Sequence, residues 1–386
     1  MSHTIWLDQK KKDLEVDVCI IGAGIAGLSV AYWLEKQMPD LKLTIVEKNQ
    51  LGSGATGRNA GFVTCGSVEH FNRMVTKHGE AQALEIWNFS EENLNLLKQE
   101  IVGNSGDKID FYQQGAFSLA AKDNELNELK EVAEIMKRNN ISVDVLNQND
   151  VKSRLGAEGF VGGIKYIDDA EVHPVKLLKA IKEKLKTNLI ENEEVYKIEE
   201  AGQERFILTP HYKIKSTFVV ICCNGYSSSI NSYFEDKIYP TRGQIMVLEK
   251  VPKFMEGPCY ANFYLDYFRQ LNSGELIIGG FRQLEKDTEK GFSDHTTEAI
   301  QEALHDFVKK HLPQFQDSKV IHRWAGVMGF SADGEPMVGS LPNDNQLFFL
   351  GGFTGHGLGL AFHGAKTLVD LMAGNQIPEW ISSKRF

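Results

Sequence analysis

The sequence predicts an α/β protein with a Rossmann-type nucleotide-binding domain, divided into several segments and interleaved with a second domain on a mixed or antiparallel sheet. Three observations predict this class. A strand, glycine turn, helix and strand follow one another over residues 17–47, and a second glycine-rich helix start lies near residue 355. Between them, two long stretches lack the alternating strand–helix pattern. The predicted limits are 1–75, 172–235 and 318–386 for the first domain, and 76–171 and 236–317 for the second.

The first unit opens with the apolar run Val18–Ile21, as expected of a parallel strand covered on both faces. The pattern G-x-G-x-x-G follows at Gly22, Gly24 and Gly27. The first glycine makes the tight turn, the second lets the backbone approach a pyrophosphate, and the third allows close packing of helix on strand. Residues 25–36 then predict a helix, whose N-terminal amides favour an anion.

The second strand of this unit, residues 41–46, is followed by Glu47, 20 residues after Gly27. A carboxylate at this spacing accepts hydrogen bonds from ribose hydroxyls and repels a 2′-phosphate. A strand, a glycine triplet, a helix and an acid in this order predict a dinucleotide site. We expect the flanking residues to line this site, namely Ala23, Ile25, Ala26 and Lys48.

A glycine-rich loop, residues 51–67, comes directly after the nucleotide-binding unit. Its small residues indicate a chain that runs close to a neighbour, and the rest of the dinucleotide is the obvious one. Thr56 offers a hydroxyl, Arg58 is the loop's cation, and Asn59 and Ala60 follow. A surface loop without a ligand is the alternative.

The remaining elements are predicted from hydrophobic periodicity and turn residues. Helices are expected over 78–101, 124–138, 175–186, 296–311 and from about 357 to 372, and strands over 111–120, 141–146, 160–167, 189–191, 195–198, 206–209, 212–214, 218–222, 239–248, 260–269, 275–281 and 347–350. Asn224-Gly225, after a buried strand, is a candidate second ligand contact at the carboxyl edge of the sheet. The strand 260–269 carries aromatic side chains, namely Phe263, Tyr264, Tyr267 and Phe268.

Composition excludes several classes of protein. The net charge of −10 argues against a nucleic-acid partner, because phosphate binding depends on Lys and Arg. Five cysteines without metal-ligand spacing predict no metal site and no disulfide framework, hence a reducing compartment. Residues 1–15 are too polar for a signal peptide and no apolar run is long enough to span a bilayer, so a cytoplasmic protein without a membrane partner is expected.

Seven motifs occur in an order that resembles the D-amino-acid-oxidase-like (DAO) superfamily of FAD-dependent oxidoreductases. They are GAGIAG with Glu47, GATGRNAGF, EVHPVKLL, YPTRGQ, RWAG, DGEPMVG and GFTGHGLGLA. The pattern is most similar to γ-glutamylputrescine oxidase, glycine oxidase and sarcosine oxidase. The resemblance implies a glutathione-reductase-like FAD-binding domain, a substrate-binding domain, and non-covalent FAD. It also implies oxidation of an amine or amino acid by hydride transfer to flavin N5, with hydrolysis of the imine and with O₂ or another electron acceptor.

The resemblance also implies site residues. The ADP would rest on the glycine triplet, with its ribose on Glu47 and its adenine at Val195. The flavin would meet the loop at Thr56, Arg58 and Asn59, and the helix start at Gly355, His356, Gly357 and Leu358. Gly225 is a further cofactor candidate, and the candidate catalytic residues are Tyr267, Arg269, Trp324, Met328 and His356.

The departures from the family pattern bear on the substrate. The arginine that amino-acid members place after W-A-G is Met328 here, and the lysine that sarcosine oxidase places after its G-H-G motif is Gly359. A buried carboxylate without such a donor is costly, which favours an amine over a small α-amino acid. A lysine associated with oxygen activation has no counterpart near Ile277. The chain could therefore be an oxidase or a dehydrogenase. A tRNA-modifying flavoenzyme and a non-catalytic FAD-binding subunit are the alternative functions. A flavin link through Cys65 and the oligomeric state also stay open.

Overall fold

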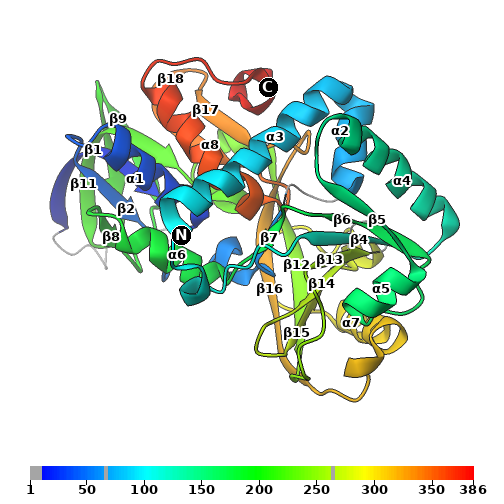
Figure 1. The fold of residues 1–386 in the computed structure, drawn as a ribbon. Helices are drawn as coiled ribbons and strands as arrows, with labels where there is room; N and C mark the ends of the chain where they lie inside the picture. The colour runs from blue at the N-terminus through cyan, green and yellow to red at the C-terminus, as the bar shows by residue number, and fades with distance from the viewer. Residues whose placement is uncertain (1–10, 65–67, 262–265) are drawn as a thin grey trace.

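A computed structural model describes residues 11–64, 68–261 and 266–386, which form two large sheets (Figure 1). The first sheet has the order β17-β18-β11-β1-β2-β8, and β10 and β9 extend it from β11. Its central strands β18, β11, β1, β2 and β8 run parallel. The strands are β1 (Lys12–Ile21), β2 (Leu43–Val46), β8 (Asn188–Ile190), β9 (Lys197–Ala201), β10 (Glu204–Leu208), β11 (Tyr212–Ile221), β17 (Met337–Leu341) and β18 (Asp344–Gly351).

Alternating side chains of β1 enter two different cores, as expected of a strand with period two. Val18 and Ile20 are buried with side chains of α1 (Ile25–Gln37) and α8 (Gly357–Met372), and these two helices pack against each other. Cys19 and Ile21 enter the core on the opposite face. The parallel sheet is therefore covered on both sides, which explains why residues 18–21 are uniformly apolar.

The second sheet has the order β16-β12-β15-β14-β13-β4-β6-β5 and is antiparallel except for the pair β13–β4. Its strands are β4 (Ala116–Ala120), β5 (Val143–Asn147), β6 (Gly162–Tyr166), β12 (Ile238–Leu248), β13 (Cys259–Ala261), β14 (Asp266–Gln270), β15 (Leu276–Gly279) and β16 (Val320–Ser331). The parallel core of the first sheet and this mixed second sheet confirm the predicted fold class. The domain limits stay a prediction, and β16, within the third predicted segment, pairs with β12 of the second sheet.

One face of the second sheet is covered by α5 (Gln148–Leu155) and α7 (Glu298–His311). Met246 and Leu248 of β12 are buried against these helices. Ile245 and Val247, one residue out of phase, belong to a separate small core with Ala60 and Ile277. The opposite face of this sheet is thus turned toward the loop that follows β2.

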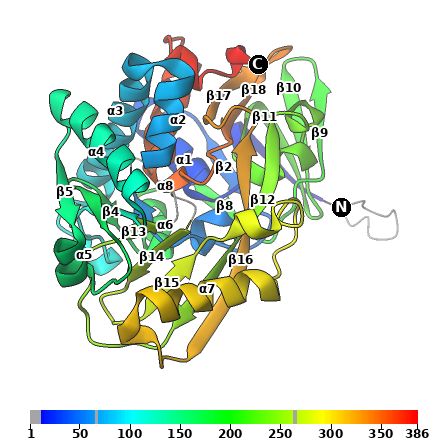
Figure 2. The same cartoon turned by 90° about the vertical axis from the view of Figure 1, so that its right-hand side faces the viewer.

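Further helices lie between the strands along the chain (Figure 2). They are α2 (Val68–His78), α3 (Glu80–Leu97), α4 (Asp123–Arg138) and α6 (Pro174–Glu183). The helix α3 packs on α8. The short strands β3 (Phe62–Val63) and β7 (Ala170–Glu171) pair with each other, and β3 contacts α8. Within the described ranges, no helix has the length and apolar composition needed to cross a membrane.

Several sequence predictions differ from the structure. Residues 212–221 form one continuous strand, not two, because β10 covers its polar first half. Residues 260–269 contribute to two strands, β13 and β14, which pair with each other. Helix α5 was not predicted, because it has only two apolar side chains, Val151 and Leu155. Helix α2 was not predicted either, although Phe71, Met74 and Val75 recur at helical spacing. Strands β16 and β17 were also not predicted. The aromatic residues Phe263 and Tyr264, like Cys65, lie outside the described residues.

Candidate active site

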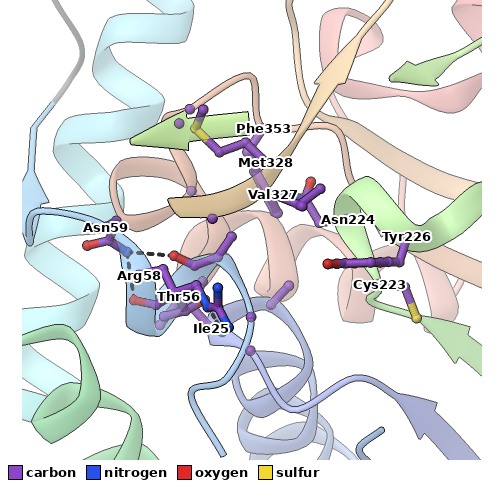
Figure 3. A pocket seen from close by; sticks show the side chains of 18 of the residues that line it. Ile25, Thr56, Arg58, Asn59, Cys223, Asn224, Tyr226, Val327, Met328 and Phe353 are labelled. Carbon is purple, nitrogen blue, oxygen red and sulfur yellow. Dashed lines mark hydrogen bonds between the residues drawn. The ribbon is translucent and has the colours of Figure 1, made fainter. Parts of the chain in front are cut away.

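A cavity of about 1040 Å³ lies where elements of the two sheets meet. This volume is at the upper end of ligand pockets, which usually hold about 300–1000 Å³. Its walls include the β1–α1 turn, the loop after β2, strands β12 and β16, and the start of α8. Figure 3 shows Thr56, Arg58 and Asn59 on one side of the cavity, and Asn224 and Tyr226 across it. Segments within residues 21–73, 193–294 and 326–359 therefore line one space.

The glycine triplet has the close contacts that its pattern predicts. Gly22 has a φ of +104°, and a Cβ there would lie 2.7 Å from the carbonyl oxygen of Cys222. A Cβ on Gly27 would lie 1.9 Å from the carbonyl oxygen of Gly22, so this glycine allows α1 to pack on β1. Gly24 faces the cavity, and the nearest atom to a Cβ there is Thr56 Oγ1, at 3.2 Å. The triplet thus builds a cradle at the first turn of α1.

Glu47 and Thr56 both bind this turn through its backbone amides. The amide of Ala23 donates to Glu47 Oε2 at 2.8 Å, and the amide of Asn49 donates to Oε1 at 3.0 Å. The amide of Ile25 donates to Thr56 Oγ1 at 3.1 Å. Because first-turn amides lack partners within the helix, the other amides of this turn stay available to an anion.

The loop residues Arg58 and Asn59 are held mainly by backbone atoms. Arg58 donates to the carbonyl oxygens of Ser53 at 2.9 Å and Ala325 at 2.7 Å, and its Nη1 lies 3.3 Å from Asp294. Asn59 Nδ2 donates to the carbonyl oxygen of Thr56 at 2.8 Å (Figure 3). These contacts fix the loop along one wall of the cavity.

The start of α8 forms another part of the lining. Gly355 has a φ of +91°, and His356 precedes the first helical residue, Gly357. Burial lowers the pKa of His356 to about 4, with a smaller contribution from the positive charge of Arg73. The imidazole is therefore neutral at neutral pH, and the positive electrostatic character of this helix start comes from its backbone amides.

Three aromatic side chains form what we call the aromatic wall, namely Phe62, Tyr260 and Tyr267, and all three line the cavity. The ring of Phe62 meets those of Tyr260 and Tyr267 edge-on, with centroids 5.2 and 5.8 Å apart. Tyr260 and Thr64 share a hydrogen bond of 2.8 Å between their hydroxyl groups. Burial raises the pKa of Tyr267 to about 12, so its hydroxyl stays protonated.

Most of the predicted site residues line this cavity. They are Gly22, Ala23, Gly24, Ile25, Ala26, Glu47, Lys48, Thr56, Arg58, Asn59, Ala60, Val195, Tyr267, Met328, Gly355, His356, Gly357 and Leu358. The tertiary fold brings together residues 22–60 and 326–359, which no rule of sequence spacing connects.

Four predicted residues lie outside the lining. Gly27 and Gly225 are packing positions, and a Cβ on Gly225 would lie 2.7 Å from the carbonyl oxygen of Met328. Arg269 is buried, with Nη1 3.3 Å from Glu171 Oε2 and a hydrogen bond to the carbonyl oxygen of Val172. Trp324 donates its Nε1 hydrogen to the carbonyl oxygen of Arg58 at 2.9 Å.

Sequence reasoning missed other lining residues, chiefly Arg73, Tyr226, Tyr260 and Phe330. No motif marks Arg73, because it lies on α2, a helix of mixed composition that was not predicted. Tyr226 follows the candidate contact Asn224-Gly225 by one residue, so the strand end before it could have drawn attention to it.

Three features of the cavity suit a dinucleotide. They are the glycine cradle, the acid at the end of β2 and the start of α8. Fold and site together define a dinucleotide-binding protein built on two large sheets. The chain matches the family model DAO, FAD dependent oxidoreductase, over residues 17–371. It therefore belongs to this family, and FAD is its cofactor.

Comparisons with individual proteins agree with this family. The chain is 24% identical over 381 residues to probable oxidoreductase OrdL of Haemophilus influenzae, covering 93% of this chain and 83% of the relative. It is 22% identical over 385 residues to γ-glutamylputrescine oxidoreductase of Escherichia coli, covering 95% and 86%. The crystal structure of glycine oxidase from Geobacillus kaustophilus superposes with a TM-score of 0.80 at 21% identity, covering 94% of this chain and 96% of that one.

Proposed function

We propose that this protein oxidises the C–N bond of a small primary or secondary amine, with FAD as the electron acceptor. The observation that carries the proposal is the aromatic wall, which shares one cavity with the glycine cradle and the start of α8. Bound FAD supplies a two-electron acceptor for the hydride of the C–H bond next to nitrogen. Two of the similar proteins are named for the nitrogen compounds γ-glutamylputrescine and glycine, which supports an amine substrate.

We assign the FAD-binding residues from their positions around the cavity. Gly22, Gly24 and the first turn of α1 hold the pyrophosphate, and Thr56 supports the turn. Glu47 accepts from the ribose hydroxyls with lone pairs that its two backbone contacts leave available. Backbone amides at the start of α8 face the flavin and stabilise negative charge there.

The aromatic wall favours the form of the amine that can react. The C–H bond next to an ammonium group cannot release a hydride, because the nitrogen lone pair that would form the C=N bond is bound to a proton. Burial against Phe62, Tyr260 and Tyr267 disfavours the charged form and lowers the pKa of a bound ammonium group. Tyr267, protonated at neutral pH, can donate a hydrogen bond that orients the substrate.

Two further positions argue against recognition of an α-amino acid in the manner of the family. Met328 lines the cavity and offers no hydrogen-bond donor. Gly359 cannot carry a side chain without rearrangement, because a Cβ there would lie 2.1 Å from the carbonyl oxygen of Thr64. The family's two cationic positions are thus occupied by a thioether and by a packed glycine.

An anaerobic panel tests the proposal. The purified holoenzyme is mixed without oxygen with aliphatic mono- and diamines, N-methylated amines and amino acids, while the visible absorption of FAD is followed. We expect at least one small amine to bleach the flavin, and readmission of air with peroxide detection then separates an oxidase from a dehydrogenase.

Two results would contradict the proposal. Bleaching by modified tRNA but by no small amine would indicate a nucleic-acid-modifying enzyme. Absence of bleaching with every compound, in protein that dithionite still reduces, would indicate a FAD-binding protein without amine chemistry.

A further inference from the structure

Arg73 of α2 lines the cavity, 13 residues after Ala60, the nearest predicted site residue in sequence. The side chain is half-buried and lines the cavity together with His356 and Gly359. Its position is defined by Gly334, since a Cβ on that glycine would lie 3.2 Å from Arg73 Nη1 and 3.3 Å from Cζ. Gly334 has a φ of +91°, which favours glycine, so the backbone leaves this space to the guanidinium.

Among the described residues, none forms a hydrogen bond or an ion pair with Arg73. Two other cations of the lining, Arg58 and Lys48, are engaged. Arg58 donates to two carbonyl oxygens, and Lys48 lies 3.2 Å from Glu194. The carboxylate of Asp333, the residue before Gly334, is bound by Arg385, at 2.6 and 3.1 Å. Arg73 therefore has five N–H donors and no described acceptor within the protein.

Glu335 is an acid whose pKa the charge of Arg73 lowers. It is 2% exposed, and burial raises its pKa, while the charge of Arg73 acts in the opposite direction. Its Oε1 lies 3.9 Å from His78 Nε2, and its Oε2 has no hydrogen-bond partner among the described atoms. Arg73 forms no ion pair with it, so the guanidinium is not committed to this carboxylate.

The acids that line the cavity also have other partners. Glu47 binds backbone amides, Glu193 binds His211, Glu194 pairs with Lys48, and Asp294 pairs with Arg58. Arg73 is thus a half-buried positive group of the cavity for which the described part of the chain supplies no anion. A partly buried guanidinium favours a planar, bidentate anion such as a carboxylate.

We infer that Arg73 binds a carboxylate carried by the amine substrate, an inference that rests on the proposed function. The substrate class is then an amine with a carboxylate, held by a residue of α2 instead of the positions of Met328 and Gly359. Neutral His356 beside it adds no competing charge. Arg73 is a specificity residue in this scheme, because it acts on a substrate group that does not react.

The test uses butyrate as a probe that cannot be oxidised at nitrogen. Butyrate is titrated into the oxidised holoenzyme while the flavin spectrum and the binding heat are recorded. We expect saturable binding that weakens about 10- to 100-fold in Arg73→Met, since charge-assisted hydrogen bonds are lost. The matched control Lys286→Met removes an exposed cation of the lining and should leave butyrate binding unchanged.

A second pair of compounds reports on the reaction. We expect 4-aminobutyrate to reduce the flavin at lower concentration than butylamine, and Arg73→Met to remove this preference by raising KM with little effect on kcat. Arg73→Lys keeps the positive charge but not the planar, bidentate guanidinium group, so it should retain part of the preference for 4-aminobutyrate. It also serves if Arg73→Met does not fold, which FAD content and circular dichroism reveal.

The failures of the two proposals are distinguishable. Butyrate that does not bind, or that binds equally well to Arg73→Met, overturns the carboxylate assignment even if amines reduce the flavin. Butyrate that binds through Arg73 while no amine reduces the flavin supports the carboxylate site and overturns the amine oxidation.

Discussion

Trp324 donates its indole Nε1 hydrogen to the backbone carbonyl oxygen of Arg58, 2.9 Å away, although 266 residues separate them in sequence. This bond connects β16 of the second sheet to the loop that follows β2 of the first. Arg58 returns the contact through its guanidinium, which donates to the carbonyl oxygen of Ala325 at 2.7 Å. The cavity wall is thus held by reciprocal bonds between the two sheets.

Substitution Trp324→Phe removes this bond while keeping an aromatic ring. We expect a loss of about 1 kcal/mol in unfolding free energy, and a several-fold weaker FAD affinity because the loop is less restrained. Urea unfolding and FAD titration of the apoprotein measure the two effects. The control is Trp33→Phe, which removes a bond of 3.0 Å to the carbonyl oxygen of Phe362. Equal loss of FAD affinity in both variants would contradict a specific role for Trp324.

Substitution Gly27→Ala tests the packing of α1 on β1. Its Cβ would lie 1.9 Å from the carbonyl oxygen of Gly22, so helix and turn must separate. We expect protein that is either insoluble or free of FAD, measured by the ratio of flavin absorption to protein absorption. In the control Gly106→Ala the nearest atom to the new Cβ is 3.5 Å away, an ordinary contact, and FAD content should be normal. A Gly27→Ala protein with full FAD content would show that the close contact is dispensable.

The sequence predicted the elements that carry strong local patterns. Helix α1, strand β2 and the end of β1 were predicted within two residues, because the glycine triplet, the apolar strand and the acid each have a separate physical reason. The start of β1 was missed, since the strand begins at Lys12, six residues before the apolar run. The start of α8 was predicted for a similar reason. Local patterns could not predict β11 as one strand, since Lys213 and Lys215 interrupt the apolar pattern and their pairing with β10 is a feature of the tertiary fold.

The less predictable part of the site comes from side chains whose role depends on the tertiary fold. Arg73 belongs to a helix without a motif, and its place in the cavity depends on Gly334, 261 residues later in the chain. Arg269 was a candidate substrate contact, yet its partner Glu171 lies on β7 and turns it into a buried ion pair. Which charge meets which partner is decided by strand pairing, and one sequence does not reveal that pairing.

Glu256 predicts a pH dependence of stability. Its carboxylate accepts from Arg154 at 2.6 and 2.8 Å and from Lys165 at 2.5 Å. The Arg154 hydrogen bonds lower the pKa of Glu256 to about 2, with Lys165 contributing and burial opposing. Because the folded-state pKa lies below the unfolded value, the stabilisation is complete above about pH 4.5 and is lost as the pH falls toward 2.

Substitution Glu256→Gln should therefore destabilise the protein by about 1–3 kcal/mol at pH 7, measured by urea unfolding. The difference from the unchanged protein should shrink as the pH is lowered from 4.5 toward 2. The control Glu158→Gln breaks an exposed pair with Lys152, 2.9 Å apart, and should cost less than about 1 kcal/mol. A difference that stays constant over this pH range would refute the assignment.

The chemistry of the described cysteines predicts non-covalent attachment of FAD. Thioether formation needs a thiolate, and burial raises the pKa of Cys223 to about 12 and that of Cys222 well above its ordinary value, although both line the cavity. The position near which sarcosine oxidase attaches its flavin is Gly326, where a Cβ would lie only 2.9 Å from Arg58 Cβ. We expect acid precipitation to release all FAD into the supernatant and to leave a colourless pellet. A yellow pellet would contradict this expectation, and its disappearance in Cys65→Ser but not in Cys223→Ser would assign the link to Cys65.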